Sequence, residues 1–336
     1  MKIIDSIKEM LGTKLKRDIK RPYFFWDLLR NGFLDVRLYI KHSNTLINFY
    51  QKDKLEAQLY KECHRIEKGM SLSEIREGFG IAAFQTILQH LTDLEKIDPE
   101  SEAKEYAGAV VKGYLELHRE FEFDDQLKAI LDSITGMSPG TRSGAGTIEL
   151  TRAQLQAGSR GTFEQLVACR HSVRQYRPEK VDVGLLQEAA RLASRTPSVC
   201  NRQAFRVRFF NNKERVDQLL RYQSGNLAFR SEIPVVAVIS VDLRFFEGAG
   251  ERNQAYVDGG LFAMSLVYGL HFVGLGTCFL NWSVRHDVDK AFRKVAFIPE
   301  TEVIITLLSV GNLKETFKVA ASPNKEFGDL FQLIED

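Results

Sequence analysis

The sequence PVVAVISV, at residues 234–241, carries the strongest strand signal in the chain. Five of its eight residues are Val or Ile, which favour strands. Apolar residues follow one another here instead of alternating with polar ones, which is typical of a strand buried on both faces. A second run of this kind, VIITLLSV, occupies residues 303–310. Together the two runs predict a sheet covered by helices on both faces.

The elements around these strands alternate between helix and strand. Helices are expected at 182–194, 213–221 and 284–295, with Asp182 as the first N-cap, and strands at 205–210 and 277–281. The apolar stretch 259–280 is about long enough to cross a bilayer. It contains His271 and several glycines, so a buried helix followed by a short strand is predicted, and no transmembrane segment.

The N-terminal part is predicted to be helical, with apolar residues at helical spacing over 54–94 and 102–121. The sequence GMSPGTRSGAG at 136–146 then supplies the residues of a loop. We therefore expect a helical N-terminal domain at 1–135, a linker at 136–160 and a second domain at 161–336. In HRIEKG, the side chains of His64, Glu67 and Lys68 lie one helical turn apart, so they form either a polar face inside the helical domain or an ion-paired surface.

Composition excludes several classes of function. The chain has 46 Lys and Arg against 44 Asp and Glu, so no overall field would attract nucleic acid. Its four cysteines show neither disulfide nor zinc spacing, which indicates a reducing compartment and no metal site. The phosphate-loop, dinucleotide and hydrolase motifs are absent as well.

The segment CRHSVRQYRPE, at residues 169–179, concentrates positive charge in an otherwise balanced chain. Guanidinium groups present a rigid fork of donors, and Ser172 adds a hydroxyl. Arg170 and Arg174 would share a face if this stretch were helical. The pattern suits a phosphate or another anion with several oxygens, while a solvated basic helix end is the alternative.

A second polar segment, TPSVCNRQAF at residues 196–205, joins a predicted helix to a predicted strand. The amides of Asn201 and Gln203 each offer a donor and an acceptor, which suits the edge of a heterocycle or the hydroxyls of a polyol. The alternative is that these side chains satisfy backbone groups within a turn.

Residues 162–336 resemble the nitroreductase family of flavin enzymes in the order of three motifs. These are RHSVR, then PSxxNxQxF leading into a strand, then the long apolar helix with GLGTCFLNW. The resemblance implies an α+β fold with a mixed central sheet flanked by helices, here preceded by an all-α N-terminal domain. It also implies an intertwined homodimer that binds FMN at the subunit interface.

The resemblance further implies a set of cofactor-binding residues. The first motif would hold the flavin phosphate and ring edge, and the second would reach the flavin from the other subunit. The backbone after GLGTC would approach N5, and a C-terminal lysine would replace the arginine that many relatives place on the phosphate. The implied residues are Arg170, His171, Ser172, Arg174, Pro197, Ser198, Asn201, Gln203, Leu280, Asn281, Lys318 and Lys325.

The implied activity is transfer of electrons from NADH or NADPH, through FMN, to an electron-poor small molecule such as a nitro compound or a quinone, in the cytoplasm. Two alternatives stay open. One is a flavin-consuming or substrate-dehydrogenating enzyme of the same superfamily. The other is a non-catalytic interaction protein with a degenerate flavin site, since a lysine in place of the C-terminal arginine would weaken the phosphate contact. The chain also has Ala204-Phe205 where the family commonly has Pro-Trp.

Overall fold

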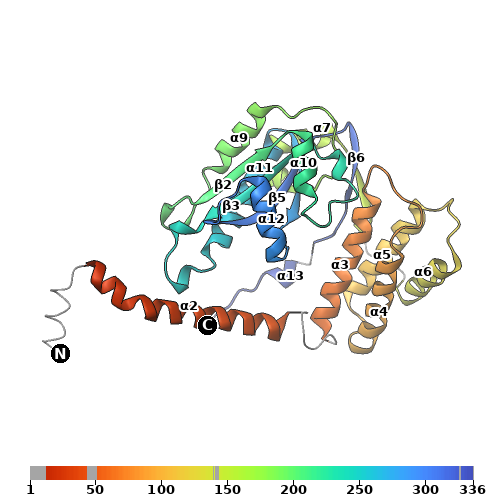
Figure 1. Ribbon diagram of the computed structural model, residues 1–336. Coiled ribbons are helices and arrows are strands. Elements are labelled where there is room, and N and C mark those ends of the chain that lie inside the picture. Colours follow the sequence, from red (N-terminus) through yellow and green to blue (C-terminus); the bar gives the residue numbers. More distant parts are fainter. Residues whose placement is uncertain (1–12, 44–50, 139, 141–143, 325–326, 336) are drawn as a thin grey trace.

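The computed structural model describes residues 13–43, 51–138, 140, 144–324 and 327–335, with backbone alone for residues 13–20. Figure 1 shows a helical part beside a part built on a central sheet, with one long helix running below the sheet part.

The helical part is a bundle of α3 (Lys52–Met70), α4 (Ile81–Ile97), α5 (Glu102–Leu117) and α6 (Asp125–Met137). Helix α3 packs on α4 and α5, and α6 packs on both α4 and α5. The apolar faces close a core that includes Leu59, Phe84, Ile87, Leu91, Val110, Tyr114 and Ile134. The structure therefore confirms a helical N-terminal part.

The helical stretch expected over 54–94 is two helices with a turn between them. Gly78 and Gly80 have φ angles of 65° and 92° in this turn, a left-handed conformation that side chains disfavour. Sequence periodicity continues on both sides of the break, because both helices bury a face in the same core.

The central sheet has the strand order β2 (Phe205–Phe210), β3 (Val235–Asp242), β5 (Glu302–Asn312), β4 (Leu275–Asn281). These strands pair antiparallel, and Ser172 adds a parallel bridge to β4, so both orientations occur. The strands predicted from the apolar runs are confirmed, and 205–210 has the predicted bounds.

Helices cover both faces of the sheet, as the apolar runs predicted. Helices α9 (Val183–Ala193) and α11 (Gln254–Phe272) pack on one face, and α10 (Lys213–Leu220) and α12 (His286–Ala296) on the other. Strand β3 divides its side chains between the faces, because successive residues of a strand point to opposite sides. Toward α9 and α11 lie Val235, Ala237, Ile239 and Val241; toward α10 and α12 lie Val236 and Val238.

Glycines let α11 lie close to its neighbours. A Cβ at Gly259 would come within 2.5 Å of Ile305, and one at Gly269 within 2.8 Å of the Ala189 carbonyl of α9. The glycine-rich stretch is thus a buried helix followed by β4, as expected. Among the described residues, no helix combines the length and apolar character needed to cross a membrane.

A two-stranded sheet joins the two parts of the molecule. Strand β1 (Thr147–Thr151) pairs antiparallel with β6 (Thr316–Ala320), and the chain continues into α7 (Arg152–Ser159) and α8 (Phe163–Cys169). Both β1 and α7 lie within the range 136–160 that the sequence analysis proposed as a linker.

Glu67 of α3 is fully buried at this junction. Its carboxylate accepts hydrogen bonds from the amide of Gly146 at 2.9 Å and from Oγ of Ser322 at 2.7 Å, and from the Tyr106 hydroxyl at 2.8 Å. His64 Nδ1 lies 2.7 Å from the same Ser322 Oγ. The two sequence interpretations of HRIEKG are therefore replaced by a third, in which this part of α3 is a joint between the helical part and the sheet part.

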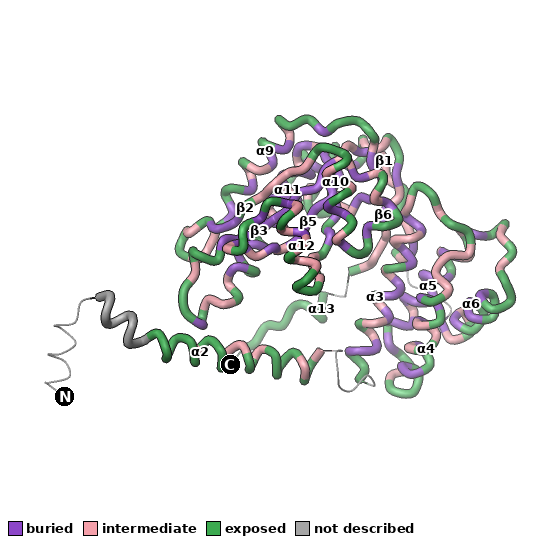
Figure 2. Tube along the Cα trace, in the orientation of Figure 1, coloured by how far each residue is buried: buried purple, intermediate pink, exposed green. Residues whose placement is uncertain are grey.

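Helix α2 (Thr13–His42) runs below the sheet part and ends beside α3, and Arg252 holds it through a bidentate ion pair with Asp35. Most of its described side chains are exposed (Figure 2). The remaining short helices are η1 (Val199–Asn201), η2 (Arg230–Glu232), η3 (Leu243–Phe245), η4 (Ala249–Glu251) and α13 (Phe327–Leu330).

Candidate functional site

The basic segment at 170–174 follows α8 and runs beside β4. Helix α8 ends at Cys169, since Arg170 has φ −74° and ψ 120°. Ser172 forms a parallel bridge with Thr277, and the amide of Val173 donates to the Thr277 carbonyl at 2.8 Å. Strand β4 therefore holds the basic segment by backbone hydrogen bonds.

The helical face considered for Arg170 and Arg174 does not form, because the segment is not helical. Alternate residues of an extended segment project to the same side, which groups Arg170, Ser172 and Arg174 opposite the buried Val173. Four residues of extended backbone span about 13 Å. This spacing suits the two ends of one long ligand better than a single compact anion.

Arg174 is only 5% exposed. Its Nη1 donates to the Ser172 carbonyl at 3.4 Å, a long contact that uses one of five N–H donors. Within the described part of the chain, no carboxylate pairs with Arg174 or with Arg170. A buried guanidinium without an acid needs another acceptor. The donor set therefore fits a ligand with phosphate and carbonyl oxygens, such as FMN.

The positive charge around Arg170 affects the histidines nearby. Burial, and then the charge of Arg170, lowers the pKa of His171. Burial and the charges of Arg170 and His171 lower the pKa of His271 to about 4. Burial is the main cause of both shifts, and the contribution of Arg170 adds a positive local charge that favours an anion.

Cys169 and His271 lie next to this segment, with Sγ and Nε2 3.0 Å apart. Burial raises the pKa of the Cys169 thiol, while the pKa of His271 is lowered. The pair is therefore a neutral thiol beside a neutral imidazole. It lacks the thiolate that a cysteine nucleophile requires.

The second motif forms a strained turn between α9 and β2. Cys200, Asn201 and Gln203 have φ angles of 48°, 54° and 49°, a left-handed region that costs non-glycine residues energy. The hydroxyl of Ser198 accepts a 2.9 Å hydrogen bond from the amide of Gln203 across the turn. Strain of this kind is retained where the surrounding structure enforces it, often at binding sites.

Two acidic residues hold the turn in place. Asp258 of α11 accepts hydrogen bonds from the amide of Val199, and Glu251 forms a bidentate ion pair with Arg202 at 2.7 and 2.9 Å. The amides of Asn201 and Gln203 remain exposed and bond to each other at 2.9 Å. The turn thus presents two amides on a fixed backbone, and Gln203 Nε2 also donates to the Asn201 carbonyl within the turn at 3.4 Å.

At the end of β4, the side chain of Leu280 is buried and that of Asn281 is exposed. Gln223 Nε2 donates to the Asn281 carbonyl at 3.2 Å and to its Oδ1 at 3.0 Å. These contacts fix the backbone where the resemblance places the flavin ring. Leu280 can take part only through its backbone.

The other implied residues are dispersed. Pro197 is exposed at the start of the strained turn, and Lys318 is half-buried on β6, opposite Glu149. Within the described residues, no hydrogen bond or ion pair connects Lys318 to the basic segment. Lys325 lies outside the described residues.

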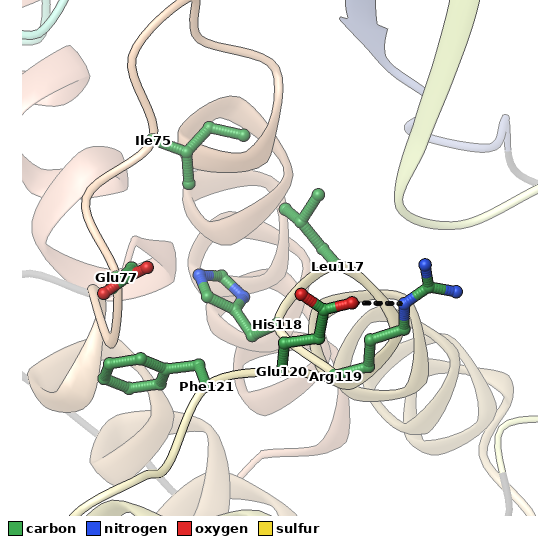
Figure 3. Close-up of a pocket in the computed structure, with 7 residues that line it drawn as sticks. All are labelled: Ile75, Glu77, Leu117, His118, Arg119, Glu120 and Phe121. Atoms are coloured by element: carbon green, nitrogen blue, oxygen red, sulfur yellow. Dashed lines mark ion pairs between the residues drawn. The ribbon is translucent and has the colours of Figure 1, made fainter.

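Two hollows lie elsewhere in the described structure. One of about 530 Å³ lies in the helical part, lined by Ile75, His118 and Phe121, with Arg119 and Glu120 paired at its edge (Figure 3). The other, of about 1070 Å³, lies between the loop after α3 and the sheet part, beside Tyr176 and Lys314. Neither is lined by the residues that the resemblance implies.

Sequence reasoning missed the neighbourhood of Lys68. This half-buried lysine is on α3. Burial, and then the charge of Arg174, lowers the pKa of Lys68. The sequence analysis identified HRIEKG as a polar pattern. Its spacing does not show that Lys68 lies near the basic segment, more than a hundred residues later in the chain.

The class of fold is therefore an α+β domain with a helix-covered sheet, preceded by a helical bundle. Residues 167–231 match the model of the nitroreductase family, and the matched region contains both motifs. The resemblance to this family is confirmed over that region, and a helical part precedes it.

Several solved structures are similar to about half of this chain. An FMN-dependent nitroreductase from Clostridium difficile is 21% identical, with 49% of this chain and 92% of that chain covered, and a TM-score of 0.41. A nitroreductase family protein from Streptococcus pneumoniae is 19% identical over 52% of this chain and 100% of that chain, with a TM-score of 0.45. No curated protein matches the sequence.

Proposed function

We propose that this protein is an FMN-dependent oxidoreductase that uses NADH or NADPH to reduce an electron-poor small molecule such as a nitro compound or a quinone. Bound FMN would accept a hydride from the nicotinamide and pass the electrons to the acceptor. The protein contributes binding, orientation and charge.

The observation that carries the proposal is the basic segment itself. Arg170 and Arg174 flank Ser172, which is bridged to β4, at most about 13 Å apart, and neither pairs with a carboxylate in the described structure. We assign the phosphate to Arg170, His171 and Ser172, and the electron-rich pyrimidine edge of the flavin to Arg174. The family match at residues 167–231 supports the same assignment.

The charge of Arg174 suits reduction of the cofactor. Reduced flavin carries negative charge at its pyrimidine edge, and a buried guanidinium stabilises it more strongly than water-exposed groups would. Burial also holds Arg174 in one position before the charge develops. We therefore expect Arg174 to favour the reduced state of the cofactor.

The strained turn supports a homodimer. Its exposed Asn201 and Gln203 amides are available to a flavin held by the basic segment of a second subunit. Helix α11 also exposes Tyr256, Val257 and Leu261, apolar residues that a subunit interface would cover.

The direct test is the visible spectrum of the purified protein, with chromatography of what heat releases. Flavin absorption and released FMN are expected, followed by bleaching on anaerobic addition of NADH or NADPH. Light scattering is expected to give the mass of a dimer. A colourless protein that takes up no added FMN would contradict the proposal, and the interaction-protein alternative would replace it.

Among flavin enzymes, the same preparation separates the reaction classes. Reoxidation by a quinone or nitro compound with intact flavin recovered supports a reductase. Fragmentation of the flavin under oxygen would instead identify the flavin-consuming alternative.

A further inference from the structure

The end of α3 is fixed against the basic segment by a buried hydrogen bond. Nε2 of Gln175 donates to the Ser71 carbonyl at 2.8 Å, and Gln175 is 7% exposed. Lys68 precedes Ser71 by about one helical turn, and Arg174 precedes Gln175 directly. The two cations therefore lie on either side of one contact between the helical part and the sheet part.

Lys68 and Arg174 are close enough to repel each other. Burial, and then the charge of Arg174, lowers the pKa of Lys68; Cys278 acts in the opposite direction, and Arg65 lowers the pKa by a smaller amount. Two neighbouring cations, one buried and one half-buried, destabilise a protein unless an acceptor lies between or beside them.

The carboxylates beside this contact are already engaged. Glu67 accepts hydrogen bonds from Tyr106, Gly146 and Ser322. Glu232 accepts from Nζ of Lys314 at 2.8 Å. Among the described residues, Lys68 itself has no ion pair. The acceptor for the two cations is therefore not a described side chain.

We propose that Lys68 joins Arg174 at the pyrimidine edge of the bound flavin, so that the helical part of the chain completes the cofactor site. This inference rests on the proposed function and adds a residue to its site. It gives the helical part a chemical role, because Lys68 reaches the site only when α3 is docked through Glu67 and Ser71.

Two cations at this edge would stabilise the reduced cofactor more than the oxidised one, because negative charge develops there on reduction. Loss of Lys68 should therefore weaken the binding of oxidised FMN, and it should weaken the binding of reduced FMN more. A further tenfold loss for the reduced state corresponds to about 30 mV in a two-electron midpoint potential.

The test compares Lys68→Met and Lys68→Gln with Lys61→Met in the full-length protein. Lys61 is on the same helix with a side chain 69% exposed, so it controls for loss of charge on α3. FMN affinity is measured by fluorescence quenching, and the midpoint potential by equilibration with a reference dye. Both Lys68 variants should bind FMN about tenfold more weakly and shift the potential downward. Lys61→Met should match the wild type, and Lys68→Arg should restore most of the affinity.

Different results overturn different claims. A wild-type protein that takes up no FMN would overturn the proposed function, and this inference with it. A wild type that binds FMN, with Lys68 variants equal to Lys61→Met in affinity and potential, would overturn the inference alone. An unchanged FMN affinity with a raised KM for NADH or NADPH would also overturn it, by assigning Lys68 to the dinucleotide.

Discussion

Ser322, just beyond β6, donates a 2.7 Å hydrogen bond to the carboxylate of Glu67 on α3, 255 residues earlier in the chain. Burial raises the pKa of Glu67, but His64, whose Nδ1 lies 3.8 Å from the carboxylate, and hydrogen bonds from Ser322, Tyr106 and Gly146 outweigh it and leave the pKa below its usual value. The buried group is therefore a carboxylate that gathers donors from both parts of the molecule. This contact sets how α3, and Lys68 with it, meets the basic segment.

Glu67→Gln should lower the free energy of unfolding by about 2 kcal/mol, because an amide nitrogen would face a donor and leave it without an acceptor in a buried site. Urea denaturation of the full chain measures this loss. Glu120→Gln is the control, since Glu120 is 90% exposed beside Arg119 and should change stability little. Equal urea midpoints for Glu67→Gln and Glu120→Gln would show that the hydrogen bonds of Glu67 contribute nothing to the free energy of unfolding.

Gly69→Ala should destabilise the protein by about 1–2 kcal/mol, although Ala is the better helix former. A Cβ at Gly69 would lie 2.2 Å from the ring of Phe79, which packs edge-on against Tyr114. Overpacking of this kind costs about 1–3 kcal/mol. At Gly136, in α6, no atom lies within 4 Å of the added Cβ. Gly136→Ala should therefore leave the unfolding free energy unchanged or raise it, and a stabilising Gly69→Ala would contradict this account.

The sequence predicted those features that depend on residues near each other. The burial of β3 on both faces follows from its own apolar run, and the bounds of β2 from its own composition. The conformation of the basic segment depends instead on Thr277, which pairs with Ser172 from 105 residues away. The local spacing of Arg170 and Arg174 was compatible with a helix, which does not form. The residue types of the basic segment alone already indicated an anion site.

The joint at Glu67 shows the same limit. Its partners Tyr106, Gly146 and Ser322 come from three separate stretches, and none shares a periodic pattern with α3. Helical spacing predicts which residues share a face of a helix, but not which other segment of the chain packs against that face. The role of Lys68 was therefore beyond prediction from the sequence, although the HRIEKG pattern was visible.

Acid should destabilise the protein partly through His271. Its pKa is about 4 in the folded chain, against 6.5 for an ordinary histidine. Between these values the unfolded chain binds a proton that the folded chain does not, so stability falls as the pH falls from 6.5 to 4. The full difference amounts to at most about 3 kcal/mol.

His271→Gln should therefore lose less unfolding free energy than the wild type between pH 7 and about pH 4.5, because one buried group no longer titrates. Urea denaturation at the two pH values gives the difference. The exposed His286 supplies the control, as His286→Gln should keep the pH dependence of the wild type. The assignment fails if His271→Gln loses as much stability in acid as the wild type does.

Arg170 and Arg174 should be separable by the choice of flavin, because they stand about 13 Å apart on one extended segment. If Arg170 binds the phosphate, Arg170→Ala should weaken FMN binding about tenfold to a hundredfold, as expected for a lost charged hydrogen bond. Riboflavin, which lacks the phosphate, should bind the variant as it binds the wild type.

If Arg174 binds the ring edge, Arg174→Ala should weaken the binding of FMN and of riboflavin by similar factors. Fluorescence titrations of the four combinations test this, with Arg285→Ala, an exposed arginine at the start of α12, as the control for lost charge. Equal losses of FMN and riboflavin for Arg170→Ala would mean that the phosphate lies elsewhere, and the ligand would then have to run along the segment in another direction.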